Sequence, residues 1–207
     1  MADPLAKGGR QIVIVDDDAD VRDSTSVLLE LGGHRVTQFE SGSALVATGI
    51  PPGTDLILLD LMMPGLNGLE TLAALKDQKL PAVIMLTGHG DIPLAVEAIK
   101  LGASDFLEKP YPTERLLELV GKAEAKPATV DEPARQAAVD KIAALSPRQL
   151  EILKAVAEGE PSKVTAHKLD LSVRTVETYR GHLFSRLGVK RLADAVKIAV
   201  LAGLVGD

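Results

Sequence analysis

The chain has 207 residues, no cysteine, 46% hydrophobic and 25% charged residues, and a formal net charge of −6. This length suits two domains that each bury a core, and the composition is that of a globular chain rather than a disordered one. Without cysteine, a disulfide framework and thiolate metal sites are excluded. Apolar runs such as 56–59 and 82–86 are too short to span a membrane, and residues 1–10 lack an apolar signal segment. We therefore expect a cytoplasmic protein without a membrane partner.

Charge is distributed unevenly along the chain. Residues 1–126 contain 11 Lys and Arg against 19 Asp and Glu, whereas the remaining residues contain 12 against 10. Within 163–197, eight basic residues oppose three acidic ones. An acidic first part and a basic second part favour different partners for the two, although a basic helical face is often simply solvated.

Short apolar runs alternate with helical patterns in the first part of the chain. Strands are expected at 12–15, 35–39, 55–59, 82–86 and 105–107, and helices at 19–31, 43–48, 69–75, 91–101 and 113–125. Five strand–helix repeats predict an α/β fold, a doubly wound five-stranded parallel sheet. Ligands of such sheets bind beyond the carboxyl ends of the strands.

The pattern changes after residue 126. Residues 127–143 contain two prolines, several alanines and no clear apolar period, so we interpret them as a linker that could be partly helical. Beyond it, only helical patterns follow, the first starting with Ser146 as N-cap and Pro147 at the first position. We therefore predict one domain at 1–126 and a small all-α domain with a helix-turn-helix at 144–207.

Ionisable and polar residues follow four of the predicted strands. Asp16 and Asp17 follow the first strand, Asp60 the third, Thr87 the fourth, and Lys109 the fifth. Carboxylates brought together at one sheet edge repel each other unless a cation lies among them, and hard oxygen ligands suit Mg²⁺. A carboxylate beside that metal can attack a phosphoryl donor and form an acyl phosphate. Lys109 and Thr87 would then bind the phosphoryl oxygens.

The simpler reading is that acidic residues after strands only cap the next helices or lie in solvent. We prefer that reading for Asp18 and Asp20. The set of Asp16, Asp17 and Asp60 together with Lys109 favours a reactive site.

Four separated motifs make residues 11–124 resemble the receiver domain of response regulators. They are VIVDDD at 13–18, LLDLMMPGLNG at 58–68, LTGHG at 86–90 and FLEKP at 106–110. The resemblance implies a flavodoxin-like fold in which Asp60 is the phosphoacceptor. It also implies that Asp16, Asp17, Asp60 and the backbone carbonyl of Met62 bind Mg²⁺.

The same resemblance implies roles for residues on the later strands. Thr87 and Phe106 would form the switch pair, and Lys109 would contact the phosphoryl group; the alternative for Phe106 is an ordinary core aromatic. A cis peptide bond is implied before Pro110. The segment 87–111 is particularly similar to the FixJ group, which implies phosphorylation-driven pairing through the fourth helix and fifth strand. His89 and Met62 would occupy positions that influence the lifetime of the acyl phosphate.

Residues 145–204 resemble the LuxR-type DNA-binding domain of the FixJ and NarL groups. The matching segments are LSPR at 145–148, IL at 152–153, Gly159, LSVRTVE at 171–177 and LGV at 187–189. Ser172 would cap the recognition helix and Val176 would anchor it. Base and phosphate contacts in a major groove are expected from Arg174, Thr175, Thr178, Tyr179 and Arg180, with further phosphate contacts from Lys163, Lys168 and Lys190.

Three residues depart from the LuxR-type pattern. Gln149 stands where Glu is usual, which removes an expected internal ion pair. Thr165 replaces an apolar residue and leaves a hydroxyl that needs a partner or solvent. Tyr179 replaces a frequent His, so the preferred half-site cannot be transferred to this chain.

These features together predict a phosphorylation-controlled transcription regulator of a two-component system. Its expected partners are a sensor histidine kinase, promoter DNA, and a second copy of itself, because one recognition helix reads few base pairs. An aspartyl-phosphate hydrolase is a competing hypothesis, but Met62 stands where such enzymes place an acid/base Asp. Two further hypotheses are a constitutive DNA-binding protein with a vestigial acidic pocket, and an RNA-binding regulator, for which aromatic stacking platforms are lacking.

Overall fold

A computed structural model describes residues 9–76, 78, 80–88, 92–123 and 132–205 of the chain. The described residues form two compact units. The first contains a sheet with helices α1, α2, α3 and α5; the second contains helices α6 to α10 together with α4. Among the described helices, none is long and apolar enough to cross a membrane.

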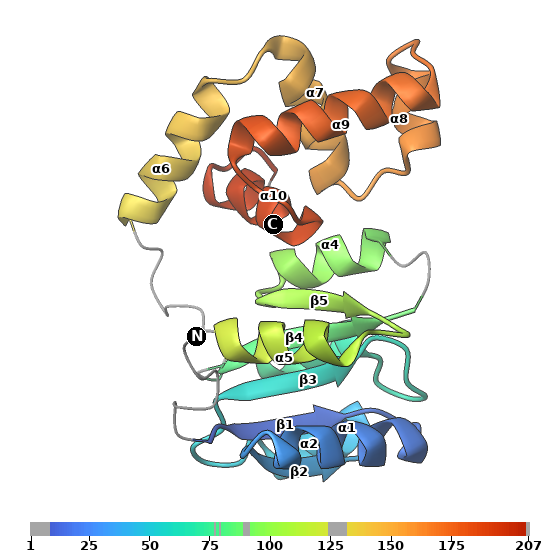
Figure 1. Ribbon diagram of the computed structural model, residues 1–207, viewed down its shortest axis with the longest axis vertical. Helices are drawn as coiled ribbons and strands as arrows, with labels where there is room; N and C mark the ends of the chain where they lie inside the picture. The colour runs from blue at the N-terminus through green and yellow to red at the C-terminus, as the bar shows by residue number, and fades with distance from the viewer. Residues whose placement is uncertain (1–8, 77, 79, 89–91, 124–131, 206–207) are drawn as a thin grey trace. The chain divides into compact units, whose positions relative to one another are not determined.

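The first unit is built on a five-stranded parallel sheet, as predicted (Figure 1). Its strand order is β2-β1-β3-β4-β5, and the strands are β1 (Gln11–Val15), β2 (Arg35–Phe39), β3 (Leu56–Asp60), β4 (Ala82–Thr87) and β5 (Asp105–Glu108). The helices between and after them are α1 (Ala19–Leu31), α2 (Gly42–Thr48), α3 (Gly68–Leu75), α4 (Ile92–Lys100) and α5 (Thr113–Lys122). The expected α/β fold is therefore confirmed.

Burial of the central strands on both faces explains their continuous apolar runs. All five residues of β3 and all six of β4 are buried. One face of the sheet forms a core with α1 and α5, to which Leu29, Leu116 and Leu119 contribute. The register places Asp60 of β3 opposite Leu86 of β4, so that the functional ends of these strands meet at one edge.

A close approach positions α3 just after the strand that ends in Asp60. A Cβ atom on Gly68 would lie 2.4 Å from the backbone oxygen of Asp60, so only glycine fits there. Asn67 and Glu70 form a capping box that starts the helix at this residue. The segment between Asp60 and Gly68 is thereby held over the end of β3.

The second unit contains the helices of the C-terminal part. They are α6 (Glu132–Ala143), α7 (Pro147–Ala157), α8 (Ser162–Lys168), α9 (Val173–Leu187) and α10 (Leu192–Leu201). Ser146 caps α7 in a capping box with Gln149, and Ser172 caps α9 by accepting a hydrogen bond from the Thr175 N–H. The helix-turn-helix is thus formed by α8 and α9 as expected.

Helix α6 lies within the residues that we interpreted as a linker. It contacts α10, and its Ala138 is only 3% exposed. Alanine favours helix but buries little area, so an alanine-rich helix shows almost no apolar period in the sequence. Residues 127–131 of the expected linker lie outside the described residues.

Candidate phosphoacceptor site and nucleic-acid interface

Three carboxylates gather at the carboxyl edge of the sheet. Oxygen atoms of Asp16, Asp17 and Asp60 all lie within 4.8 Å of one another. Asp16 is fully buried and Asp60 is 6% exposed, whereas Asp17 lies at the surface. The strand ends therefore bring together the acidic residues that the sequence singled out.

Lys109 places its ammonium between two of these carboxylates. Its Nζ lies 2.6 Å from Oδ2 of Asp16 and 3.0 Å from Oδ1 of Asp60. Burial would lower the pKa of Lys109, but its hydrogen bonds to Asp16 and Asp60 outweigh that effect and the pKa is raised. Lys109 therefore remains an ammonium ion and offsets part of the negative charge.

Asp60 is largely buried beside two other carboxylates and the Lys109 ammonium. Burial raises its pKa, and this outweighs the hydrogen bond and charge of Lys109, which lower it. The charges of Asp16 and Asp17 add to the rise. A partly desolvated carboxylate beside two others is a site where a bound divalent cation is strongly favoured.

Backbone contacts hold the loop that carries Asp16. The backbone N–H of Asp18 donates to Oδ1 of Asp16 at 3.0 Å. Nη1 of Arg22, on α1, donates to the backbone oxygen of Asp16 at 2.7 Å. Arg22 was not among the predicted site residues, because a guanidinium bound to a backbone oxygen leaves no motif of its own. The Asp18 side chain caps α1, which confirms the simpler reading for this residue.

The remaining receiver residues lie close to the strand ends. Thr87 ends β4 and is 3% exposed, and its backbone oxygen accepts the N–H of Lys109 at 2.7 Å. Phe106 is half-buried on β5, and the peptide bond before Pro110 is cis, as expected. The side chain of Met62 is 61% exposed. His89, expected to influence the acyl phosphate, lies outside the described residues.

These residues fit a magnesium ion. Hard carboxylate oxygens from Asp16, Asp17 and Asp60 converge in one place, which is the donor set that Mg²⁺ prefers. Lys109 contacts two of the three carboxylates, so further positive charge is needed to balance the cluster.

The expected DNA contacts lie on and beside α9. Val176 is 1% exposed and anchors the helix, while Arg174, Thr178, Lys163 and Lys190 are exposed. Thr175 and Tyr179 are half-buried, and Oγ1 of Thr175 lies 2.7 Å from the Ser172 hydroxyl.

Two of the expected basic contact residues, Arg180 and Lys168, have side-chain partners within the unit. Nη1 of Arg180 donates to the Ser162 hydroxyl at 2.9 Å and lies 3.6 Å from the Glu177 carboxylate. The Ser162 hydroxyl in turn donates to Glu177. Lys168 forms an ion pair with Glu160. Arg180 therefore links α8 to α9, a role that the sequence pattern did not predict.

Two framework contacts concern residues near the departures from the LuxR-type pattern. Nη2 of Arg148 donates to the backbone oxygen of Leu169 at 2.8 Å, which connects α7 to the end of α8. Thr165 is 3% exposed, and its hydroxyl donates to the Pro161 oxygen at 3.4 Å. The buried hydroxyl thus has the partner that its burial requires.

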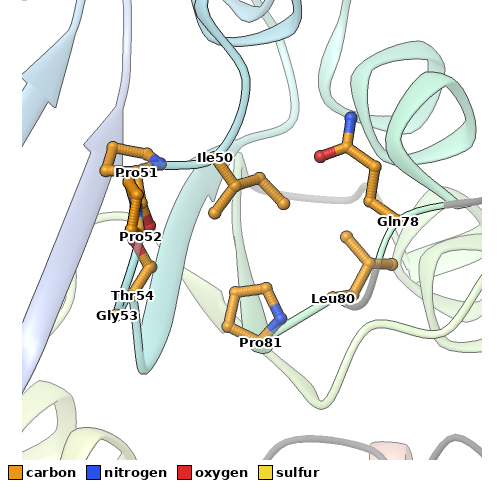
Figure 2. Close-up of a pocket in the computed structure, with 8 residues that line it drawn as sticks. All are labelled: Ile50, Pro51, Pro52, Gly53, Thr54, Gln78, Leu80 and Pro81. Carbon is orange, nitrogen blue, oxygen red and sulfur yellow. The ribbon is translucent and has the colours of Figure 1, made fainter.

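Figure 2 shows a surface pocket of the sheet unit, to which none of the acidic residues contributes. Its lining comes from the segments that precede β3 and β4, at the amino ends of these strands. None of its eight lining residues is ionisable: Ile50, Pro51, Pro52, Gly53, Thr54, Gln78, Leu80 and Pro81. The cluster of Asp16, Asp17 and Asp60 lies at the other, carboxyl ends of the strands.

Comparison with known proteins agrees with a sheet unit followed by a helical unit. Residues 12–121 match the response regulator receiver domain, and residues 143–199 match the bacterial regulatory proteins of the luxR family. The transcriptional regulatory protein FixJ of Bradyrhizobium diazoefficiens is 38% identical over 199 residues, covering 95% of this chain and 97% of FixJ. FixJ of Azorhizobium caulinodans is 41% identical over 194 residues, covering 92% of each chain.

A solved structure extends the similarity to the fold. Full-length FixJ from B. japonicum is 37% identical, with a TM-score of 0.53 over 97% of this chain and all of that one. The fold and the acidic site define a response regulator, a class of regulators rather than of classical enzymes. The chain belongs to the response regulators that combine a receiver domain with a LuxR-type helix-turn-helix domain.

Proposed function

We propose that this protein is the phosphorylation-controlled transcription regulator of a two-component system, in which a sensor histidine kinase phosphorylates Asp60. The observation that supports it most directly is the Lys109 ammonium, 2.6 Å from Asp16 and 3.0 Å from Asp60, beside the exposed carboxylate of Asp17. Burial alone gives no reason to gather these charges at one sheet edge, because unpaired buried carboxylates are destabilising.

Phosphoryl transfer uses the residues of this cluster. An oxygen of Asp60 attacks the phosphorus atom of the donor, the bond to the donor's leaving group breaks, and an acyl phosphate forms. Asp16, Asp17, Asp60 and the backbone carbonyl of Met62 would hold Mg²⁺, which would neutralise part of the charge on the phosphoryl oxygens. Attack of water on the same phosphorus atom would restore the Asp60 carboxylate and release phosphate.

Lys109 and Thr87 change their contacts when Asp60 is phosphorylated. Lys109 exchanges its carboxylate contact for a phosphoryl oxygen, a stronger charge-assisted partner. The Thr87 hydroxyl donates to another phosphoryl oxygen and moves toward it, which leaves space that the Phe106 ring can enter. Such a movement shifts a two-state equilibrium at the surface of the receiver and promotes pairing with a second copy.

DNA binding belongs to the helical domain. We place the receiver at 1–126, the connecting segment at 127–143 and the DNA-binding domain at 144–207. Helix α9 enters the major groove, with Arg174, Thr175, Thr178 and Tyr179 facing it and Arg180 at its edge. Lys163, Lys168 and Lys190 add phosphate contacts. A dimer is required because two recognition helices read a site long enough for specific binding.

A phosphorylation experiment tests the first half of the proposal. Wild type and Asp60→Asn are incubated with acetyl phosphate and Mg²⁺, and intact mass and oligomeric state are measured. Wild type should gain one phosphoryl group, lose it in acid and in base, and form dimers, whereas Asp60→Asn should do none of these. Equal labelling of both proteins, or no labelling of wild type, contradicts the assignment of Asp60.

A salt titration tests the second half. Affinity for duplex DNA should fall steeply as salt concentration rises, because phosphate contacts release counterions. A flat salt dependence contradicts DNA binding through the basic residues of the helical domain.

A further inference from the structure

The recognition helix contains a glycine that its own unit does not require. Gly181 is the ninth of the fifteen residues of α9 and is exposed. Its φ lies outside the left-handed region, so backbone conformation does not demand glycine. Glycine in a helix interior is less stable than alanine, because it loses more backbone freedom on folding. Glycine at this position therefore makes α9 less stable than alanine would, and a contact that requires glycine would explain its presence.

Packing within the chain does not supply that explanation. Apart from its two chain neighbours and the adjacent backbone of α9 itself, a Cβ atom built on Gly181 meets no atom of the described residues within 4 Å. The contrast is with Gly42 and Gly68, where a Cβ atom would lie 1.9 Å from the Thr71 hydroxyl and 2.4 Å from the Asp60 oxygen. At those two positions the neighbour that excludes a side chain belongs to the protein. Near Gly181 the space is open.

The face of α9 that carries Gly181 is the face assigned to DNA. Arg174 and Thr178 precede it by seven and three residues, a spacing that puts all three on one side of a helix. Both are exposed. Glu177, the one acidic residue of α9, is held by Ser162 and Arg180, which offsets its repulsion of phosphates.

We propose that Gly181 is the point at which duplex DNA approaches the backbone of α9, so that a side chain there would limit how deeply the helix enters the major groove. This inference rests on the proposed DNA-binding function of α9. The dimensions support it, since a helix with side chains is about 10–12 Å across and the major groove is about 12 Å wide. With so little clearance, the absence of one side chain allows closer contact by Arg174 and Thr178.

The inference predicts opposite effects on folding and on binding. Gly181→Ala should slow hydrogen exchange of the α9 amides by roughly fivefold, as removal of a helical glycine does. The same change should weaken DNA binding several-fold, and Gly181→Gln should weaken it by about tenfold or more. Gly121→Ala in α5 is the matched control, because a Cβ atom there also meets no described atom within 4 Å. It should leave DNA affinity unchanged.

The experiment uses the full chain, phosphorylated with acetyl phosphate and Mg²⁺. The probe is a duplex that wild type selects from a random-sequence library, and affinity and salt dependence are measured for each variant. Lower affinity of both Gly181 variants with undiminished protection of α9 supports the inference. Unchanged or higher affinity of Gly181→Ala and Gly181→Gln overturns it while the DNA-binding function stands. Failure of wild type to select any duplex overturns both.

Discussion

The two units of this protein differ in how deeply their candidate functional residues are buried. In the sheet unit, Asp16, Asp60 and Thr87 are at most 6% exposed and lie where strand ends converge. In the helical unit, Arg174 and Thr178 project from the exposed face of α9. In the function proposed above, the acidic site is nearly complete within the chain, whereas the α9 surface is completed only by DNA.

This difference determines whether a substitution in each unit lowers stability, function or both. A buried charge depends on its counter-ion for folding as well as for chemistry, so substitution there affects stability and function together. An exposed charge contributes little to folding and can be removed with a pure loss of binding. Measurements that separate stability from function therefore test the comparison directly.

The largest effect is expected at Lys109. Lys109→Met leaves the buried carboxylates of Asp16 and Asp60 without their cation. Breaking such a pair should lower the free energy of unfolding by about 3 kcal/mol. This is the low end of the range for buried pairs, because the Lys109 side chain is 26% exposed. Urea unfolding of the sheet unit without Mg²⁺ measures this loss. Added Mg²⁺ should restore part of it, since a metal ion at the cluster replaces the missing charge.

Lys122→Met provides the control for that substitution. Lys122 also pairs with a carboxylate, Glu118, but on the exposed surface of α5. Its loss should leave unfolding nearly unchanged and independent of Mg²⁺. Equal effects of the two substitutions would contradict the distinction between a buried site and a surface pair.

The sequence was sufficient for the acidic site because parallel strands impose its geometry. Once β1 and β3 were recognised from their apolar runs, Asp16 and Asp60 had to lie at the same edge. Arg22 was not predictable in the same way, since its bond to the Asp16 backbone depends on a rotamer and not on a residue pattern. The sequence allowed helix within the linker but did not place α6, because this alanine-rich segment has one buried residue, Ala138, and almost no apolar period.

The helical unit shows where prediction from sequence stops. The spacing of apolar residues along α9 predicts which side of the helix is buried, and Val176 was correctly placed on that side. The period does not show which exposed side chains are already engaged. Arg174 and Arg180 are both basic residues of α9, yet only Arg180 is bound to Ser162 and Glu177.

An intermediate effect is expected from these two arginines. Arg174→Ala should lower affinity for the selected duplex about tenfold and reduce the salt slope by about one, with unchanged stability. Arg180→Ala should also destabilise the helical unit by about 1 kcal/mol, because it removes a hydrogen bond between α8 and α9. Affinity titrations and urea unfolding distinguish them. Identical profiles for the two variants would show that Arg180 acts only through DNA.

The smallest effect concerns pH and the sheet unit. Nδ1 of His34 accepts a hydrogen bond from the backbone N–H of Arg10 at 3.2 Å, and Nη2 of Arg10 donates to the Gly121 oxygen at 3.3 Å. Burial, and then the charge of Arg10, lower the pKa of His34 below its usual 6.5. The unfolded chain therefore binds more protons below that value, so stability should fall as pH decreases through about 6.5 and level off below the folded pKa.

His34→Asn tests this coupling because it keeps an acceptor but cannot be protonated. Hydrogen exchange of the β1 and β2 amides, measured between about pH 7.5 and 5.5 and corrected for the intrinsic rate, should lose part of its pH dependence in the variant. His182→Asn, at an exposed position on α9, serves as the control. An unchanged pH dependence in His34→Asn would mean that His34 does not couple proton binding to folding. The carboxylate cluster acts in the opposite direction, because the raised pKa of Asp60 means that the folded chain binds the extra proton there and gains stability as pH falls.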